Sequence, residues 1–186
     1  MQNNTIVSEI NNFAMQNGVV LGLFGIGSLM VFRWSLTVPF LSTLFCVMIL
    51  SYPILAAFLT MRVRNYYVEG TGEFSFMNGF LHALFTSFYA SIWVALFTFV
   101  YLQYFDHGTI FEVYAKAIDT PEMQAYLQET GVNAELANLS GSQGIKGLVE
   151  AMEKIGPATY AAMTLYSTIF FGPIISLVIA LICRKK

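Results

Sequence analysis

Charged side chains are scarce in this sequence. Asp, Glu, Lys and Arg make up only 11% of its 186 residues, whereas a typical soluble domain has about 25%. So few charges cannot cover the surface of a soluble globule, and 56% of the residues are hydrophobic. The composition therefore predicts an integral membrane protein.

Cysteine is scarce as well. Cys46 and Cys183 lie in separate apolar segments without a Cys-x-x-Cys pair, so we interpret both as small packing residues rather than a disulfide. The net charge is −2 and no basic stripe with aromatics is present, so nucleic acid is not an expected partner. Without a Gly-x-Ser-x-Gly motif or a His-rich ligand set, we expect no catalytic residues, no metal and no cofactor.

Four apolar segments are long enough to cross a bilayer, which takes about 20 helical residues. They lie at about 13–32, 38–61, 78–104 and 158–183. Because backbone polar groups in lipid need internal partners, all four are expected to be helices. The predicted fold class is all-α, a polytopic membrane protein in one domain over residues 1–186, with an outer helical segment at 106–157 between the third and fourth spans.

Basic residues follow two of these spans. Arg62 and Arg64 come after the second span, and Arg-Lys-Lys at 184–186 comes after the fourth. The positive-inside rule places both regions in the cytoplasm, together with both termini. The segment 106–157, with eight acidic residues and three lysines, is then outside. No Lys or Arg precedes the first span, so we expect it to be retained rather than cleaved as a signal peptide.

The outer segment carries several helix signals. Thr109 and Glu112 match a capping box. Thr120 precedes a proline, as at a helix start, and Gly131 is a typical stop. Apolar residues recur at helical spacing over 145–155. We expect two or three short amphipathic helices, interpreted as a self-packed cap, with a position in the membrane interface or a partner-binding surface as alternatives.

Small residues recur on one face of the first span and of the fourth span, as is typical of helix packing in membranes. The residues assigned to helix packing are Gly18, Gly22, Gly25, Thr168, Gly172 and Ser176. Pro53 and Pro173 interrupt the second and fourth spans. We interpret both as ordinary kinks, although broken helices also mark binding sites in transporters.

A polar stripe follows one face of the third span, and its ionisable member is His82. At roughly 14 Å from the span centre, His82 is expected near the inner membrane boundary, bonded to Asn78, a threonine or water. That packing role is the preferred interpretation. A lipid head-group contact and a proton relay are the alternatives. The candidate ligand-binding residues are Asn78, His82, Thr86, Tyr89, Arg62 and Arg64.

The order of several motifs resembles the bacterial membrane proteins catalogued as domain of unknown function 4199. The motifs are "NGVVLGLFGI", "EFSFMNGFLHALFTSF", "LVEAMEKIGP" and "FFGPIISLVIALICRKK", and they extend over almost the whole chain. The resemblance implies a four-helix protein of the bacterial inner (cytoplasmic) membrane without assigned catalytic residues. It also implies a membrane protein partner such as a polyprenyl-phosphate glycosyltransferase.

Three functional hypotheses follow. The preferred one is a non-enzymatic accessory or scaffold subunit of an envelope-related membrane complex, bound to a membrane protein or to further copies of itself in the lipid bilayer. The second is a small oligomeric transporter or lipid-carrier flippase. The third is a membrane enzyme in which His82, Arg62 and Arg64 handle a phosphate.

Overall fold

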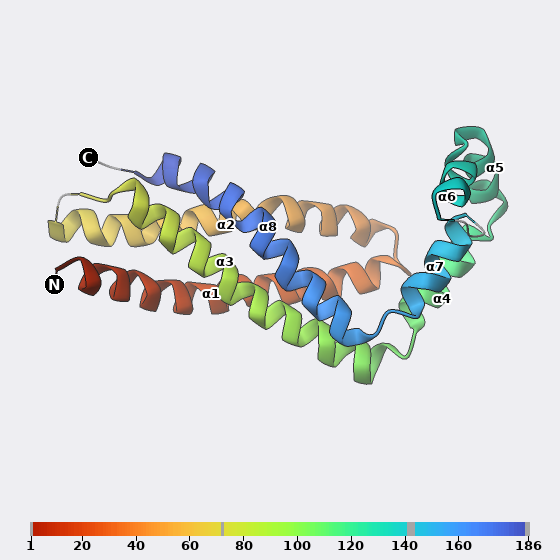
Figure 1. The fold of residues 1–186 in the computed structure, drawn as a ribbon, viewed down its shortest axis with the longest axis horizontal. Coiled ribbons are helices and arrows are strands. Elements are labelled where there is room, and N and C mark those ends of the chain that lie inside the picture. Colours follow the sequence, from red (N-terminus) through yellow and green to blue (C-terminus); the bar gives the residue numbers. More distant parts are fainter. Residues whose placement is uncertain (1, 72, 141–143, 185–186) are drawn as a thin grey trace. The chain divides into compact units, whose positions relative to one another are not determined.

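Nearly all of the described chain is helical (Figure 1). The computed structural model describes residues 2–71, 73–140 and 144–184, so the predicted basic residues 185–186 lie outside the described residues. The long helices are α1 (Gln2–Ser35), α2 (Phe40–Thr71), α3 (Phe76–Tyr101) and α8 (Pro157–Cys183). Each is long and apolar enough to cross a membrane. These helices confirm the predicted all-α polytopic membrane fold.

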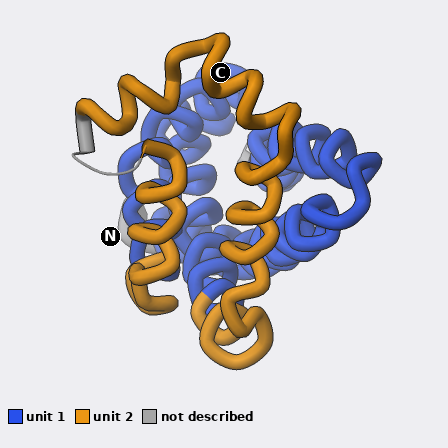
Figure 2. Tube along the Cα trace, turned by 90° about the vertical axis from the view of Figure 1, so that its right-hand side faces the viewer, with its two compact units in different colours: residues 1–98, 161–186 blue, residues 99–160 orange. Residues whose placement is uncertain are grey.

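The chain divides into two compact units (Figure 2). Unit 1 comprises residues 1–98 and 161–186, and unit 2 comprises residues 99–160. Unit 1 therefore holds most of the four long helices. Its helix α1 begins and its helix α8 ends at the same end of the unit, and the turn between α1 and α2 lies at the other end, which we call the hairpin end (Figure 1).

Three glycines bring α1 against α3 in unit 1. A Cβ atom added at Gly18, Gly22 or Gly25 would lie 2.5–2.9 Å from a side-chain atom of α3. Contacts this short are essentially absent from proteins, so only glycine permits the approach. The spacing of four and three residues places all three on one face of α1, which is why the approach continues along the helix.

The core of unit 1 draws on all four long helices. Its buried members are Leu21, Ala56, Leu59, Ala83, Ala90, Ile179 and Cys183. Helices α3 and α8 approach closely at Gly79, where an added Cβ would lie 3.4 Å from the Cα of Ala180. Helices α2 and α8 also meet here, since the Cys183 Sγ lies 3.9 Å from the Ala57 carbonyl oxygen.

Unit 2 contains four short α-helices in its described part, where two or three were predicted. They are α4 (Thr109–Ile118), α5 (Pro121–Thr130), α6 (Val132–Ser140) and α7 (Ile145–Glu153). The hydroxyl of Thr120 accepts a hydrogen bond from the Met123 amide at 3.4 Å and caps α5. Gly131 ends that helix at φ +68°, a backbone conformation that favours glycine.

The predicted capping box at Thr109 is wrong. A five-residue π-helix, η1 (Leu102–Asp106), continues α3, and the next two residues, His107 and Gly108, adopt left-handed conformations. Helix α4 therefore has Gly108 as its N-cap, and Thr109 instead donates its hydroxyl proton to the Asp106 carbonyl oxygen at 2.5 Å. The Asp106 carboxylate accepts a hydrogen bond from the Ile110 backbone N–H at 3.2 Å, so it satisfies one of the free N–H groups in the first turn of α4.

Candidate functional site

His82 lies inside the bundle, at the centre of a polar cluster that joins three helices. We define this cluster as Asn17 of α1, Thr60 of α2, and His82 and Thr86 of α3. The imidazole is fully buried. Its Nε2 lies 3.0 Å from the Asn17 Nδ2, and its Nδ1 lies 3.0 Å from the Thr60 Oγ1. The Thr86 hydroxyl is 3.5 Å from the same Nε2.

The bonding of its neighbours assigns a neutral tautomer to His82. The Thr60 hydroxyl donates its proton to the Ala56 carbonyl oxygen at 2.9 Å, so toward the ring it can only accept. The Nδ1 atom must therefore carry the ring proton and donate it. The Asn17 amide then donates to the unprotonated Nε2. Both ring nitrogens are satisfied, and the cluster links α1, α2 and α3 without a charge.

The rest of the predicted stripe also faces α1 in part. Tyr89 donates its hydroxyl proton to the Asn11 Oδ1 at 2.8 Å. Asn78 is half-buried, and its backbone N–H donates to the Ser75 hydroxyl at 3.1 Å. The sequence named Asn78, a threonine or water as partners for His82. The structure has two threonines, Thr60 and Thr86, in that role and adds Asn17 of α1. A stripe on one helix carries no information about which residues face it.

Arg62 and Arg64 do not join this cluster. Residues two apart on a helix point about 200° away from each other, so the two guanidinium groups leave α2 on nearly opposite faces. Arg62 is exposed, and Arg64 donates to the Asn65 Oδ1 at 2.9 and 3.2 Å. The hydrogen bonds of His82 are made with Asn17, Thr60 and Thr86, and neither arginine takes part in them.

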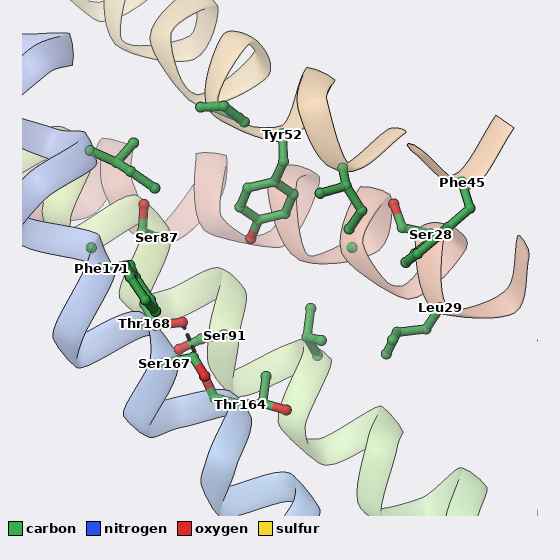
Figure 3. A pocket seen from close by; sticks show the side chains of 16 residues that line it. Ser28, Leu29, Phe45, Tyr52, Ser87, Ser91, Thr164, Ser167, Thr168 and Phe171 are labelled. Carbon is green, nitrogen blue, oxygen red and sulfur yellow. Dashed lines mark hydrogen bonds between the residues drawn. The ribbon is translucent and has the colours of Figure 1, made fainter. Parts of the chain in front are cut away.

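A pocket of about 550 Å³ lies between α1, α2, α3 and α8 in unit 1 (Figure 3). Its walls include apolar side chains such as Leu29, Phe45 and Phe171. Seven hydroxyl-bearing residues also line it: Ser28, Tyr52, Ser87, Ser91, Thr164, Ser167 and Thr168. No charged residue is among its described lining residues. The volume is typical of small-molecule sites, which occupy about 300–1,000 Å³.

Several residues that the sequence assigned to helix packing line this pocket. Gly25, Thr168 and Gly172 belong to the lining, and so does Pro53. Ser176 is fully buried, and its hydroxyl has no hydrogen-bond partner among the described residues. Sequence reasoning did not find the pocket, although the small residues and the proline that shape it were visible. Within the described residues, no three His, Cys, Asp or Glu side chains gather where they could hold a metal ion.

Four long apolar helices, three of them joined by a neutral polar cluster and all four lining an uncharged pocket, define a multi-pass α-helical membrane protein. The chain belongs to the family described as protein of unknown function (DUF4199), whose model matches residues 16–185. That match confirms the resemblance found in the sequence. No curated protein and no solved structure matches the chain.

Proposed function

We propose that the protein is a non-enzymatic accessory or scaffold subunit of an envelope-related membrane complex. Its place is the bacterial inner membrane, with both termini in the cytoplasm and unit 2 outside. The positions of Arg62, Arg64 and Arg184 support this orientation, because basic residues are retained on the cytoplasmic side.

One observation carries this proposal: unit 2 exposes more large apolar side chains than it buries. Among its described residues, only Ile118 and Leu127 are buried hydrophobic side chains. Six others outside the membrane-spanning helices are at least 37% exposed: Tyr114, Met123, Tyr126, Val132, Leu148 and Met152. Aromatic residues and methionine are enriched in protein interfaces. A surface of this kind on a largely acidic segment supports docking to a partner protein.

A pull-down from native membranes in mild detergent, followed by mass spectrometry, tests the proposal. We expect a stoichiometric protein partner with the unaltered chain. Tyr126→Ser removes a side chain that is 58% exposed and should release that partner, whereas Gln128→Ser on the same helix should not. Purification of a monomer without any partner would refute the accessory role.

The second candidate, a small oligomeric transporter or lipid-carrier flippase, is favoured by the two prolines. Pro53 lines the pocket, and Pro173 directly follows the lining residue Gly172. Each proline removes a helical hydrogen bond to the carbonyl four residues earlier, at Ile49 and Ile169. Both helices continue through their prolines, so each is weakened rather than broken beside the pocket. Breaks in helices near the substrate site are a common feature of transporters. Flux of a lipid carrier or an ion into reconstituted liposomes would support this function, and absence of flux would count against it.

A further inference from the structure

The pocket opens sideways between α2 and α8. These helices meet near Ala57 and Cys183 and separate toward the hairpin end (Figure 1). Three of the lining residues are also exposed on the outside of the unit: Ile49 by 50%, Phe171 by 55% and Ile175 by 36%. The pocket wall therefore continues onto the surface that faces the hydrocarbon of a bilayer.

The hydroxyls of the pocket are largely occupied by their own helices. Ser28, Ser91, Ser167 and Thr168 each donate to a backbone carbonyl three or four residues earlier, at 2.7–3.2 Å. Such bonds satisfy the hydroxyl proton internally. A charged or strongly polar ligand would lose its water here without receiving an opposite charge, which is costly. The chemistry of the walls fits a ligand made mostly of hydrocarbon.

The length of the pocket also suits a hydrocarbon chain. On α8 the lining runs from Thr164 to Ile175, which is about 16 Å at the helical rise of 1.5 Å per residue. The volume of about 550 Å³ is typical of small-molecule sites. An elongated, uncharged space whose walls offer few free hydroxyl protons suits one hydrocarbon chain.

We propose that this pocket binds one acyl chain of a membrane lipid, which enters between α2 and α8 while its head group stays outside. The acyl chain makes van der Waals contacts with α2 and α8 where these helices diverge and do not contact each other. It needs no hydrogen bond from the pocket walls. Its presence explains how the long gap beside Pro53 is filled. This site is independent of the partner-binding surface proposed for unit 2, since it lies wholly within unit 1.

Photo-crosslinking tests the site in the full-length protein. The probe is a phosphatidylethanolamine with a diazirine in its acyl chain, incorporated into liposomes that contain the protein. Labelled residues are mapped by mass spectrometry. We expect labels on pocket-lining residues of α2, α3 and α8. Ser167→Trp places a large side chain in the pocket and should reduce this labelling about tenfold, equivalent to ~1.4 kcal/mol.

Two further variants make the result decisive. Tyr166→Trp, at a lipid-facing position that is 69% exposed and outside the lining, should leave pocket labelling unchanged. Ser91→Leu fills the pocket from α3 instead of α8 and replaces Ser167→Trp if that variant unfolds, as judged by circular dichroism. Labels confined to lipid-facing residues such as Tyr166, or pocket labelling unaffected by filling, would overturn the proposal. Tyr126→Ser in unit 2 should not change pocket labelling, so loss of the partner and loss of the lipid site are distinguishable.

Discussion

Replacing Gly18 with alanine tests whether the close approach of α1 and α3 holds the bundle together. The added Cβ would lie 2.5 Å from the Tyr89 Cβ and 3.2 Å from the Thr86 carbonyl oxygen. The Tyr89 Cβ is bonded directly to the backbone and the Thr86 carbonyl oxygen is a backbone atom, so neither atom can move away by a side-chain rotation. The two helices must move apart instead.

The expected cost follows from these distances. Carbon atoms in ordinary contact lie about 3.5–4.0 Å apart, so α1 and α3 would separate locally by about 1 Å. Forcing extra atoms into a packed interior costs roughly 1–3 kcal/mol. Gly27→Ala is a matched control on the same helix, because its added Cβ would lie 3.8 Å from the Met48 Cε, an ordinary contact. That variant should gain up to about 1 kcal/mol from the better helix propensity of alanine.

The assay is equilibrium unfolding of the purified protein in mixed micelles, followed by circular dichroism. Because the propensity gain is common to both variants, we expect the free energy of unfolding of Gly18→Ala to be lower than that of Gly27→Ala by about 1–3 kcal/mol. Equal stability of the two variants would refute the reasoning, since it would mean that α1 does not approach α3 as closely as the glycines indicate.

His82→Ala and Asn17→Ala should each lower the free energy of unfolding. A double-mutant cycle should give a coupling energy of about 0.6–1.7 kcal/mol, as for other hydrogen bonds between membrane helices. Strictly additive effects of the two substitutions would contradict the hydrogen bond. Gly131→Ala should destabilise the end of α5 by about 1–2 kcal/mol because its φ is +68°, measurable as faster amide hydrogen exchange in that helix; unchanged exchange would count against it. In a chain without its native cysteines, Glu150→Cys should react with an impermeant maleimide on intact cells and Arg64→Cys should not; the reverse pattern would exclude the proposed orientation.

The membrane-spanning architecture could be predicted because it depends on local properties. Length and apolar content suffice to identify a span, and each predicted span overlaps one long helix. Helix α1 nevertheless begins at Gln2 and α2 continues to Thr71, beyond the predicted apolar limits. Helical hydrogen bonds extend through polar flanking residues as easily as through apolar ones, so hydropathy underestimates helix length.

Capping shows both the success and the limit of local signals. The Thr120 and Gly131 signals describe a helix start and stop that depend only on neighbouring residues, and the structure has both. The equally local signal at Thr109 fails because η1 and the left-handed turn at 107–108 move the helix start, and Asp106 takes over the capping. The sequence contains no pattern that predicts a π-helix at this place.

The sequence by itself determined that the chain is a helical, multi-pass membrane protein of a particular family, because hydrophobic length and motif order are readable one segment at a time. The tertiary structure decided which side chains meet. The pairing of His82 with Asn17 and Thr60 depends on the rotation and register of three helices. The pocket depends on where α2 and α8 diverge. Those relations arise from packing between distant segments, which no single segment encodes.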